Sequence, residues 1–169
     1  MMKRIIPPAL IASGFLLSFG AVSLLFLNSP RRSLPIVDLP QQIAGVSLTA
    51  AQEGADAISA ISDLHGQGFP VDYGAVGIYG DHRMTLWVAG AASDSFAAQM
   101  TAAMQQKIAE GNSPFTPVEE IDVGNRKVYA LEGMGQQHYY FQSQNLVIWL
   151  AVDPPIANEA LQQILEVYS

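Results

Sequence analysis

The feature that most constrains this chain is a long uncharged, apolar run close to its N-terminus. Residues 5–27 are 23 consecutive residues without a charged side chain. As an α-helix, a run of this length spans roughly 35 Å, which exceeds the ~30 Å hydrocarbon core of a bilayer. Lys3 and Arg4 precede the run, and Arg31 and Arg32 follow it. The pattern therefore predicts one membrane-spanning helix at residues 5–27.

A cleaved signal peptide is the competing interpretation of the same run. It requires an apolar stretch of about 7–15 residues that ends in small side chains. Small residues are present between Ser18 and Ser23, but the apolar run continues through Leu27. The length therefore favours an uncleaved anchor over secretion after cleavage. The basic residues on the two sides are nearly equal in number, so we take the common orientation, in which the following domain lies outside the cytoplasm.

The formal net charge of −7 is the sum of two unlike parts. Residues 1–32 hold four basic residues and no acidic one, whereas residues 33–169 hold four basic and all fifteen acidic residues, for a net charge of −11. A domain this acidic repels phosphate backbones, so we expect no nucleic-acid partner. The absence of cysteine excludes a disulfide framework, a thiolate metal site and a cysteine nucleophile.

The sequence divides into four parts. These are a short cytoplasmic N-terminus at residues 1–4, the membrane helix at 5–27, a proline-rich stalk at 28–48 and a globular domain at 49–169. Prolines oppose regular structure in the stalk because they lack a backbone N–H. Its apolar residues nevertheless predict that part of the stalk packs against something.

Helix signals occur at three places in the globular domain. The capping-box pattern of Thr49 and Gln52 predicts a helix that ends near Gly66. Ser93 or Asp94 predicts the start of a second helix, which ends at Gly111. The third helix is predicted to begin after Asp153, where a proline occupies the first helical position.

Strand signals fill the space between these helices. Six strands are expected, at residues 73–79, 84–89, 118–123, 127–132, 136–142 and 146–152. Short turn sequences separate them in pairs, which is typical of β-hairpins. The order α-β-β-α-β-β-β-β-α predicts an α+β domain with a mainly antiparallel sheet of about six strands and helices packed on it.

Alternation along the strands predicts two different sheet faces. The first face is mainly aliphatic, with Val76, Ile78, Met84, Leu86, Val88, Val128, Tyr139, Phe141, Leu146, Ile148 and Leu150. The opposite face is aromatic, with Tyr73, Tyr79, Trp87, Tyr129, His138, Tyr140 and Trp149. A solvated sheet face is usually polar, so an aromatic one needs an explanation.

Three explanations of the aromatic face are open. The stalk or the last helix covers it, or it is a recognition surface, or the assumed register is shifted by one residue. For the recognition surface, the candidate binding residues are Tyr79, Trp87, Tyr129, His138, Tyr140 and Trp149. A protein partner or a small apolar ligand would suit such a surface.

The sequence contains no recognisable catalytic pattern. Its three histidines, His65, His82 and His138, lie far apart and match no metal-ligand spacing. We therefore expect neither a metal nor another cofactor, and no enzymatic activity. The sequence predicts a membrane-tethered, extracytoplasmic binding or accessory module. A carrier of small apolar ligands or lipids is the alternative, and a hydrolase is a more remote one.

Overall fold

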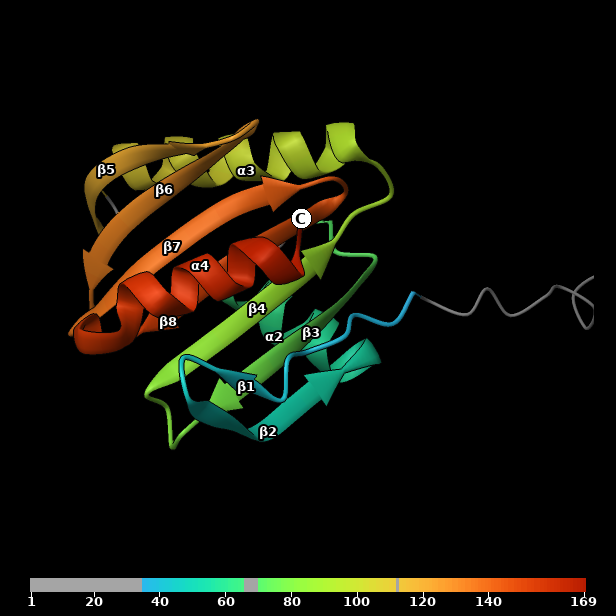
Figure 1. Cartoon of the computed structure of the whole chain (residues 1–169). Coiled ribbons are helices and arrows are strands. Elements are labelled where there is room, and N and C mark those ends of the chain that lie inside the picture. The colour runs from blue at the N-terminus through green and yellow to red at the C-terminus, as the bar shows by residue number, and fades with distance from the viewer. Residues whose placement is uncertain (1–34, 66–69, 112) are drawn as a thin grey trace, which may run out of the picture. The chain divides into compact units, whose positions relative to one another are not determined.

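The computed structural model describes residues 35–65, 70–111 and 113–169 (Figure 1). The predicted membrane helix at residues 5–27 lies outside these described residues. Within them, no helix is both long and apolar enough to cross a bilayer.

One antiparallel sheet of eight strands forms the centre of the described chain. In spatial order the strands are β1 (Gln42–Ile43), β2 (Val46–Glu53), β3 (Tyr73–Tyr79), β4 (Met84–Gly90), β8 (Leu146–Val152), β7 (Gln136–Ser143), β6 (Arg126–Gly133) and β5 (Thr116–Val123). The helices are α2 (Gly54–His65), α3 (Asp94–Ala109), the short 3₁₀-helix η1 (Pro154–Ile156) and α4 (Ala157–Val167). The α+β class and the antiparallel sheet are thus confirmed, with eight strands rather than six.

The two additional strands come from the segment before α2. Ala44 and Gly45 both have positive φ and turn β1 back onto β2. The predicted helix start at Thr49 is wrong, because Thr49 lies within β2 and its hydroxyl donates to the Ile78 carbonyl across the strand pair. The helix begins only at Gly54. Residues 42–48 of the predicted stalk are therefore part of the sheet or of its first turn.

The helices cover opposite faces of the sheet (Figure 1). Helix α4 packs on one face, which we call the α4 face, with buried residues such as Leu86, Phe141 and Ile148. Helices α2 and α3 pack on the other, the α3 face, with buried residues such as Tyr140 and Val147. The domain therefore has a three-layer arrangement with an apolar core on each side of the sheet.

Strand β3 departs from the predicted face assignment. Val76 is paired with Trp87 and packs on the α3 face, whereas Tyr73 and Tyr79 pack on the α4 face. The prediction for β3 was therefore shifted by one residue. The reason is that the Tyr73 ring lies over Gly90 of the neighbouring strand. A Cβ at Gly90 would lie only 2.3 Å from that ring, so the ring fits on this face only because Gly90 has no side chain. The tyrosine rings of β3 thus fill space that glycines leave open, and no aliphatic alternation marks the strand.

Tyrosine hydroxyls fasten the first described residues to the α4 face. The Tyr79 hydroxyl donates to the Pro40 carbonyl at 2.9 Å, and the Tyr168 hydroxyl donates to the Asp38 carbonyl at 2.9 Å. Val37 is buried in the same core. Each tyrosine therefore contributes an apolar ring to the core and satisfies a backbone carbonyl at its rim.

Candidate functional site

A row of aromatic side chains crosses the α3 face from strand to strand. Tyr129, Tyr140, Trp149 and Trp87 are direct partners on the neighbouring strands β6, β7, β8 and β4. The rings of Tyr129 and Tyr140 stack with centroids 4.7 Å apart, and those of Tyr140 and Trp149 stack at 5.3 Å. We call these four residues the aromatic row.

His138 lies next to this row and is tied into it by hydrogen bonds. The Trp149 Nε1–H donates to His138 Nδ1 at 3.1 Å. Because an indole nitrogen can only donate, His138 Nδ1 must be unprotonated and the ring proton must sit on Nε2. That Nε2 lies 3.0 Å from the Gly133 carbonyl, to which it donates. Burial lowers the pKa of His138, against the smaller raising effect of the Gly133 carbonyl.

Side chains of α3 and one loop residue cover the row. Met100, Met104 and Ile108 of α3 pack in the same core, and Phe115 stands with its ring centroid 4.7 Å from His138 and 5.0 Å from Trp149. The expected covers, the last helix and the stalk as far as residues 35–48 describe it, instead contribute to the core of the opposite face. Phe115 belongs to the loop before β5, so this loop seals the end of the row that carries His138.

The six predicted binding residues therefore fall into three groups. Tyr140 and His138 are 1% and 4% exposed and have little surface for a ligand. Trp87, Tyr129 and Trp149 are half-buried and remain candidates for binding. Tyr79 is fully buried on the α4 face, so its predicted place on the aromatic face is corrected.

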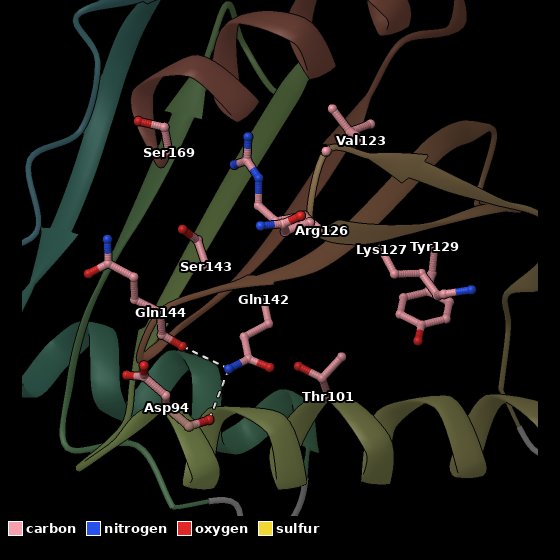
Figure 2. A pocket seen from close by; sticks show the side chains of 12 residues that line it. Asp94, Thr101, Val123, Arg126, Lys127, Tyr129, Gln142, Ser143, Gln144 and Ser169 are labelled. Atoms are coloured by element: carbon pink, nitrogen blue, oxygen red, sulfur yellow. Dashed lines mark hydrogen bonds between the residues drawn. The ribbon is translucent and has the colours of Figure 1, made fainter.

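A hollow of about 710 Å³ opens at the Tyr129 end of the row (Figure 2). Its lining residues are Asp94, Thr101, Val123, Gly124, Asn125, Arg126, Lys127, Tyr129, Gln142, Ser143, Gln144 and Ser169. They come from the first half of α3, the β5–β6 turn with the start of β6, the end of β7 and the C-terminal residue. This hollow was not predicted from the sequence, although the β5–β6 and β7–β8 turns must lie at the same end of an antiparallel sheet.

Hydrogen bonds fix the frame of the hollow. The Gln142 side-chain amide donates to the carbonyls of Asp94 at 2.9 Å and Gln144 at 2.8 Å, as Figure 2 shows. The Thr101 hydroxyl donates to the Ala97 carbonyl at 3.0 Å within α3. Gln142 thus joins the start of α3 to the β7–β8 turn, so the two walls of the hollow are held together by one side chain.

Two adjacent basic residues lie in the lining. Arg126 Nη1 donates to the carbonyls of Leu165 and Tyr168, each at 2.9 Å, and so satisfies the C-terminal end of α4. Lys127 Nζ lies 2.9 Å from the Glu120 carboxylate and 3.7 Å from that of Asp122. The hydrogen bond to Glu120 is the main reason that the pKa of Lys127 is raised. Half of the basic residues in 33–169 are therefore found at this hollow.

The described ranges hold no group of three or more His, Cys, Asp or Glu residues arranged to bind a metal ion. His82 is exposed in the β3–β4 turn, where its carbonyl accepts a hydrogen bond from Gln136. His65 is the last residue of α2. The structure thus places His82 on a turn and His138 inside a core.

Comparisons with known proteins give little similarity. No protein-family model and no curated protein matches the chain. Among solved structures, a GTP-binding regulator from Thermotoga maritima superposes with a TM-score of 0.45 at 12% sequence identity. The superposition covers 76% of this chain and 81% of that one. Nothing about the ligand of this chain follows from a likeness of this degree.

Proposed function

We propose that this chain is a membrane-tethered, extracytoplasmic binding module that holds a loop of a partner protein in the hollow beside Tyr129. The observation that carries the proposal is the convergence of several separate segments on one hollow, with an aromatic ring and two basic residues in its lining. The tether is the apolar run at residues 5–27. The module acts by binding and performs no catalysis of its own.

Tyr129 provides the contact surface in this proposal. Its ring stacks on Tyr140, which itself is held by Trp149, so its orientation is fixed before any partner arrives. Tyrosine is favoured in protein interfaces because a rigid, half-apolar ring loses little conformational entropy on binding. A preorganised ring at the end of a buried row suits a loop that packs against it.

The polar lining selects the chemistry of the partner loop. The exposed Gln144 amide suits both the carbonyl and the N–H groups of a peptide backbone, and the Gln142 side-chain oxygen, whose amide N–H groups bond within the chain, can accept from a peptide N–H. Lys127 and Arg126 favour carbonyl or carboxylate acceptors, although both already make hydrogen bonds within the chain. The partner loop is therefore expected to be polar and rich in acceptor groups.

A carrier of apolar ligands or lipids fits this geometry less well. Met100, Met104 and Ile108 fill the space between α3 and the sheet as buried core residues. Most residues that line the hollow beside Tyr129 have polar side chains, whose carbon atoms form a comparable share of its surface, so the hollow offers hydrogen-bonding groups that an apolar ligand would not use. The arrangement therefore favours a protein partner over an apolar small molecule.

Photo-crosslinking in native membranes tests the proposal. A photoreactive amino acid replaces Gln144, which is exposed in the lining, and as a control Ser59, which is exposed on α2. We expect one partner protein to be captured at Gln144 and not at Ser59, and its capture to be lost on Tyr129→Ala. Equal capture at both positions, or capture that survives Tyr129→Ala, would overturn the proposal.

A further inference from the structure

The outer edge of β2 is an unprotected sheet edge. Strand β1 covers only its beginning, through the pairs of Gln42 with Ser47 and Ile43 with Val46 and a hydrogen bond from Leu48 N–H to the Gln41 carbonyl. Beyond Leu48, no other strand of the described chain lies next to this side of β2. An edge of this kind is a template for pairing with another strand.

The opposite edge of the sheet, β5, is protected in several ways. It carries Pro117, a register shift between Pro117 and Glu119, and the carboxylates of Glu119, Glu120 and Asp122. Proline, bulges and charges are the usual means by which proteins prevent edge-to-edge pairing. On β2, the exposed residues from Thr49 to Gln52 are uncharged and include no proline. The lack of protection is thus specific to β2.

The hydrogen-bond pattern identifies which backbone groups of β2 face outward. The Ser47 carbonyl accepts from Gly80 N–H and so faces β3, while Leu48 N–H faces β1. The register then shifts by one residue at Thr49. Because these directions alternate along a strand, the backbone groups of Ala51 and Glu53 face away from β3. The N–H and C=O of Ala51 and the N–H of Glu53 therefore face outward at the edge, while the Glu53 carbonyl lies at the start of α2, where it accepts the first hydrogen bond of the helix.

We propose that this edge pairs with β2 of a second copy of the chain, in antiparallel orientation. Placing Ala51 opposite Glu53 of the partner subunit, and the reverse, lets the Glu53 N–H of each copy donate to the Ala51 carbonyl of the other, and brings each Ala51 N–H to the Glu53 carbonyl that caps α2. Gln52 then meets the partner's Gln52 on a two-fold axis, between two hydrogen-bonded pairs. Strand β1 bounds the free edge on one side and the start of α2 at Gly54 bounds it on the other, so the free edge is short.

Charge explains why the second copy binds at this edge and in this direction. Glu53 is the one charged residue between Leu48 and Gly54, and antiparallel pairing puts it opposite an uncharged alanine. Parallel pairing would place the two Glu53 carboxylates side by side, which is unfavourable. A β5–β5 contact would gather six carboxylates. The acidic domain thus meets its own copy at its uncharged edge.

The net charge of −11 on residues 33–169 makes this pairing dependent on salt. Two acidic domains repel one another, and salt screens that repulsion, since the Debye length falls from about 10 Å at 0.1 M to about 3 Å at 1 M. The dimer is therefore expected to strengthen as ionic strength rises. A pairing driven by oppositely charged surfaces would weaken under the same change.

Disulfide trapping tests the pairing in the full chain, because the protein has no cysteine of its own. Opposed residues at a non-hydrogen-bonded antiparallel pair have Cα atoms about 4.5 Å apart, which is within disulfide range. We expect Gln52→Cys to form a disulfide-linked dimer in membranes under mild oxidation. Val118→Cys, at a position 51% exposed on the β5 edge, is the control and should stay monomeric.

A second variant separates loss of pairing from loss of folding. Ala51→Pro removes one outward N–H and leaves the inward groups that bond to β3 intact. In the Gln52→Cys background it should abolish the dimer, while circular dichroism and thermal unfolding stay unchanged. The proposal is overturned if Gln52→Cys stays monomeric, if it crosslinks no better than Val118→Cys, or if a normally folded Ala51→Pro variant still forms the dimer.

Discussion

The two faces of the sheet bury aromatic side chains in different ways. On the α4 face, tyrosine rings enter an aliphatic core singly, and the hydroxyls of Tyr79 and Tyr168 bond to backbone carbonyls of the first described segment. On the α3 face, the rings stack on one another, and Trp149 and His138 bond side chain to side chain. On the α4 face the tyrosines therefore hold the first described segment against the core, whereas on the α3 face the aromatic rings form the continuous aromatic row.

The comparison shows that an aromatic sheet face does not by itself indicate a binding surface. Among the residues that the structure describes, no buried side-chain nitrogen or oxygen lacks a hydrogen-bond partner. The polar atoms of the α3 face are therefore satisfied within the domain. What distinguishes this face is that its row ends in a half-buried ring, Tyr129, at an open hollow.

The largest expected effect on stability comes from removing the ring at the centre of the aromatic row. Tyr140→Ala removes a ring that is 1% exposed and stacked on both sides, so we expect the free energy of unfolding to fall by about 3–5 kcal/mol. Phe141→Ala, 0% exposed on the other face, serves as the matched comparison and should cost about as much. Chemical denaturation measures both. A cost well below that of Phe141→Ala would mean that the row is not a packed core.

A smaller effect is expected where the α4 face meets the hollow. Arg126→Ala removes two hydrogen bonds to the last carbonyls of α4, and we expect a loss of about 1–3 kcal/mol. Hydrogen exchange should show the loss concentrated at the C-terminal end of α4. If that end keeps its protection in Arg126→Ala, the guanidinium is not what holds it.

His138 should make the α3 face sensitive to acid. The folded-state pKa of His138 is lowered, so the folded protein binds this proton more weakly than the unfolded chain does. Stability is then complete above the unfolded pKa of about 6.5 and falls as the pH drops below it, by at most about 1.4 kcal/mol per pH unit. The main reason is burial, which disfavours the charged imidazolium, and a proton on Nδ1 would in addition face the Trp149 N–H.

Unfolding measured between pH 8 and pH 5 checks this expectation against His138→Phe. The variant loses two hydrogen bonds and should be less stable at pH 8, but its stability should change less between pH 7 and pH 5 than that of the original chain. Parallel pH profiles for the two proteins would show that His138 does not titrate differently in the folded and unfolded states.

The smallest effect on stability is expected at Lys127. Its ion pairs with Glu120 and Asp122 are exposed to solvent, where such pairs contribute little. Lys127→Gln should leave the unfolding midpoint unchanged while it reduces partner capture from Gln144. A shifted midpoint with unchanged capture would assign Lys127 to stability rather than to binding.

Much of the fold could be predicted because local signals agreed with the final structure. The turns at Gly124–Asn125 and Ser143–Asn145 separate strands whose apolar alternation is strong, and all six predicted strands are present. Ser93 accepts a hydrogen bond from Phe96 N–H, as expected of a helix cap. These features depend only on neighbouring residues, so the sequence alone was enough.

The predictions failed where contacts between residues far apart in the sequence determine the local structure. The Thr49 pattern resembles a helix cap, but pairing with β3 draws the segment into the sheet. The face of β3 could not be predicted from alternation, since the rings of Tyr73 and Tyr79 fill the space over Gly90 and Gly77. The hollow was not predicted because its walls come from segments far apart in the chain. The bond between Trp149 and His138 likewise depends on the register of two strands.

The most direct test of the account measures folding and binding together in Tyr129→Ala. Tyr129 is half-buried at the end of the row and contributes little to its centre. We predict a protein that folds, with a smaller loss of stability than in Tyr140→Ala, but that no longer captures the partner crosslinked from Gln144. Full capture by a folded Tyr129→Ala protein would contradict the claim that the hollow is the binding site.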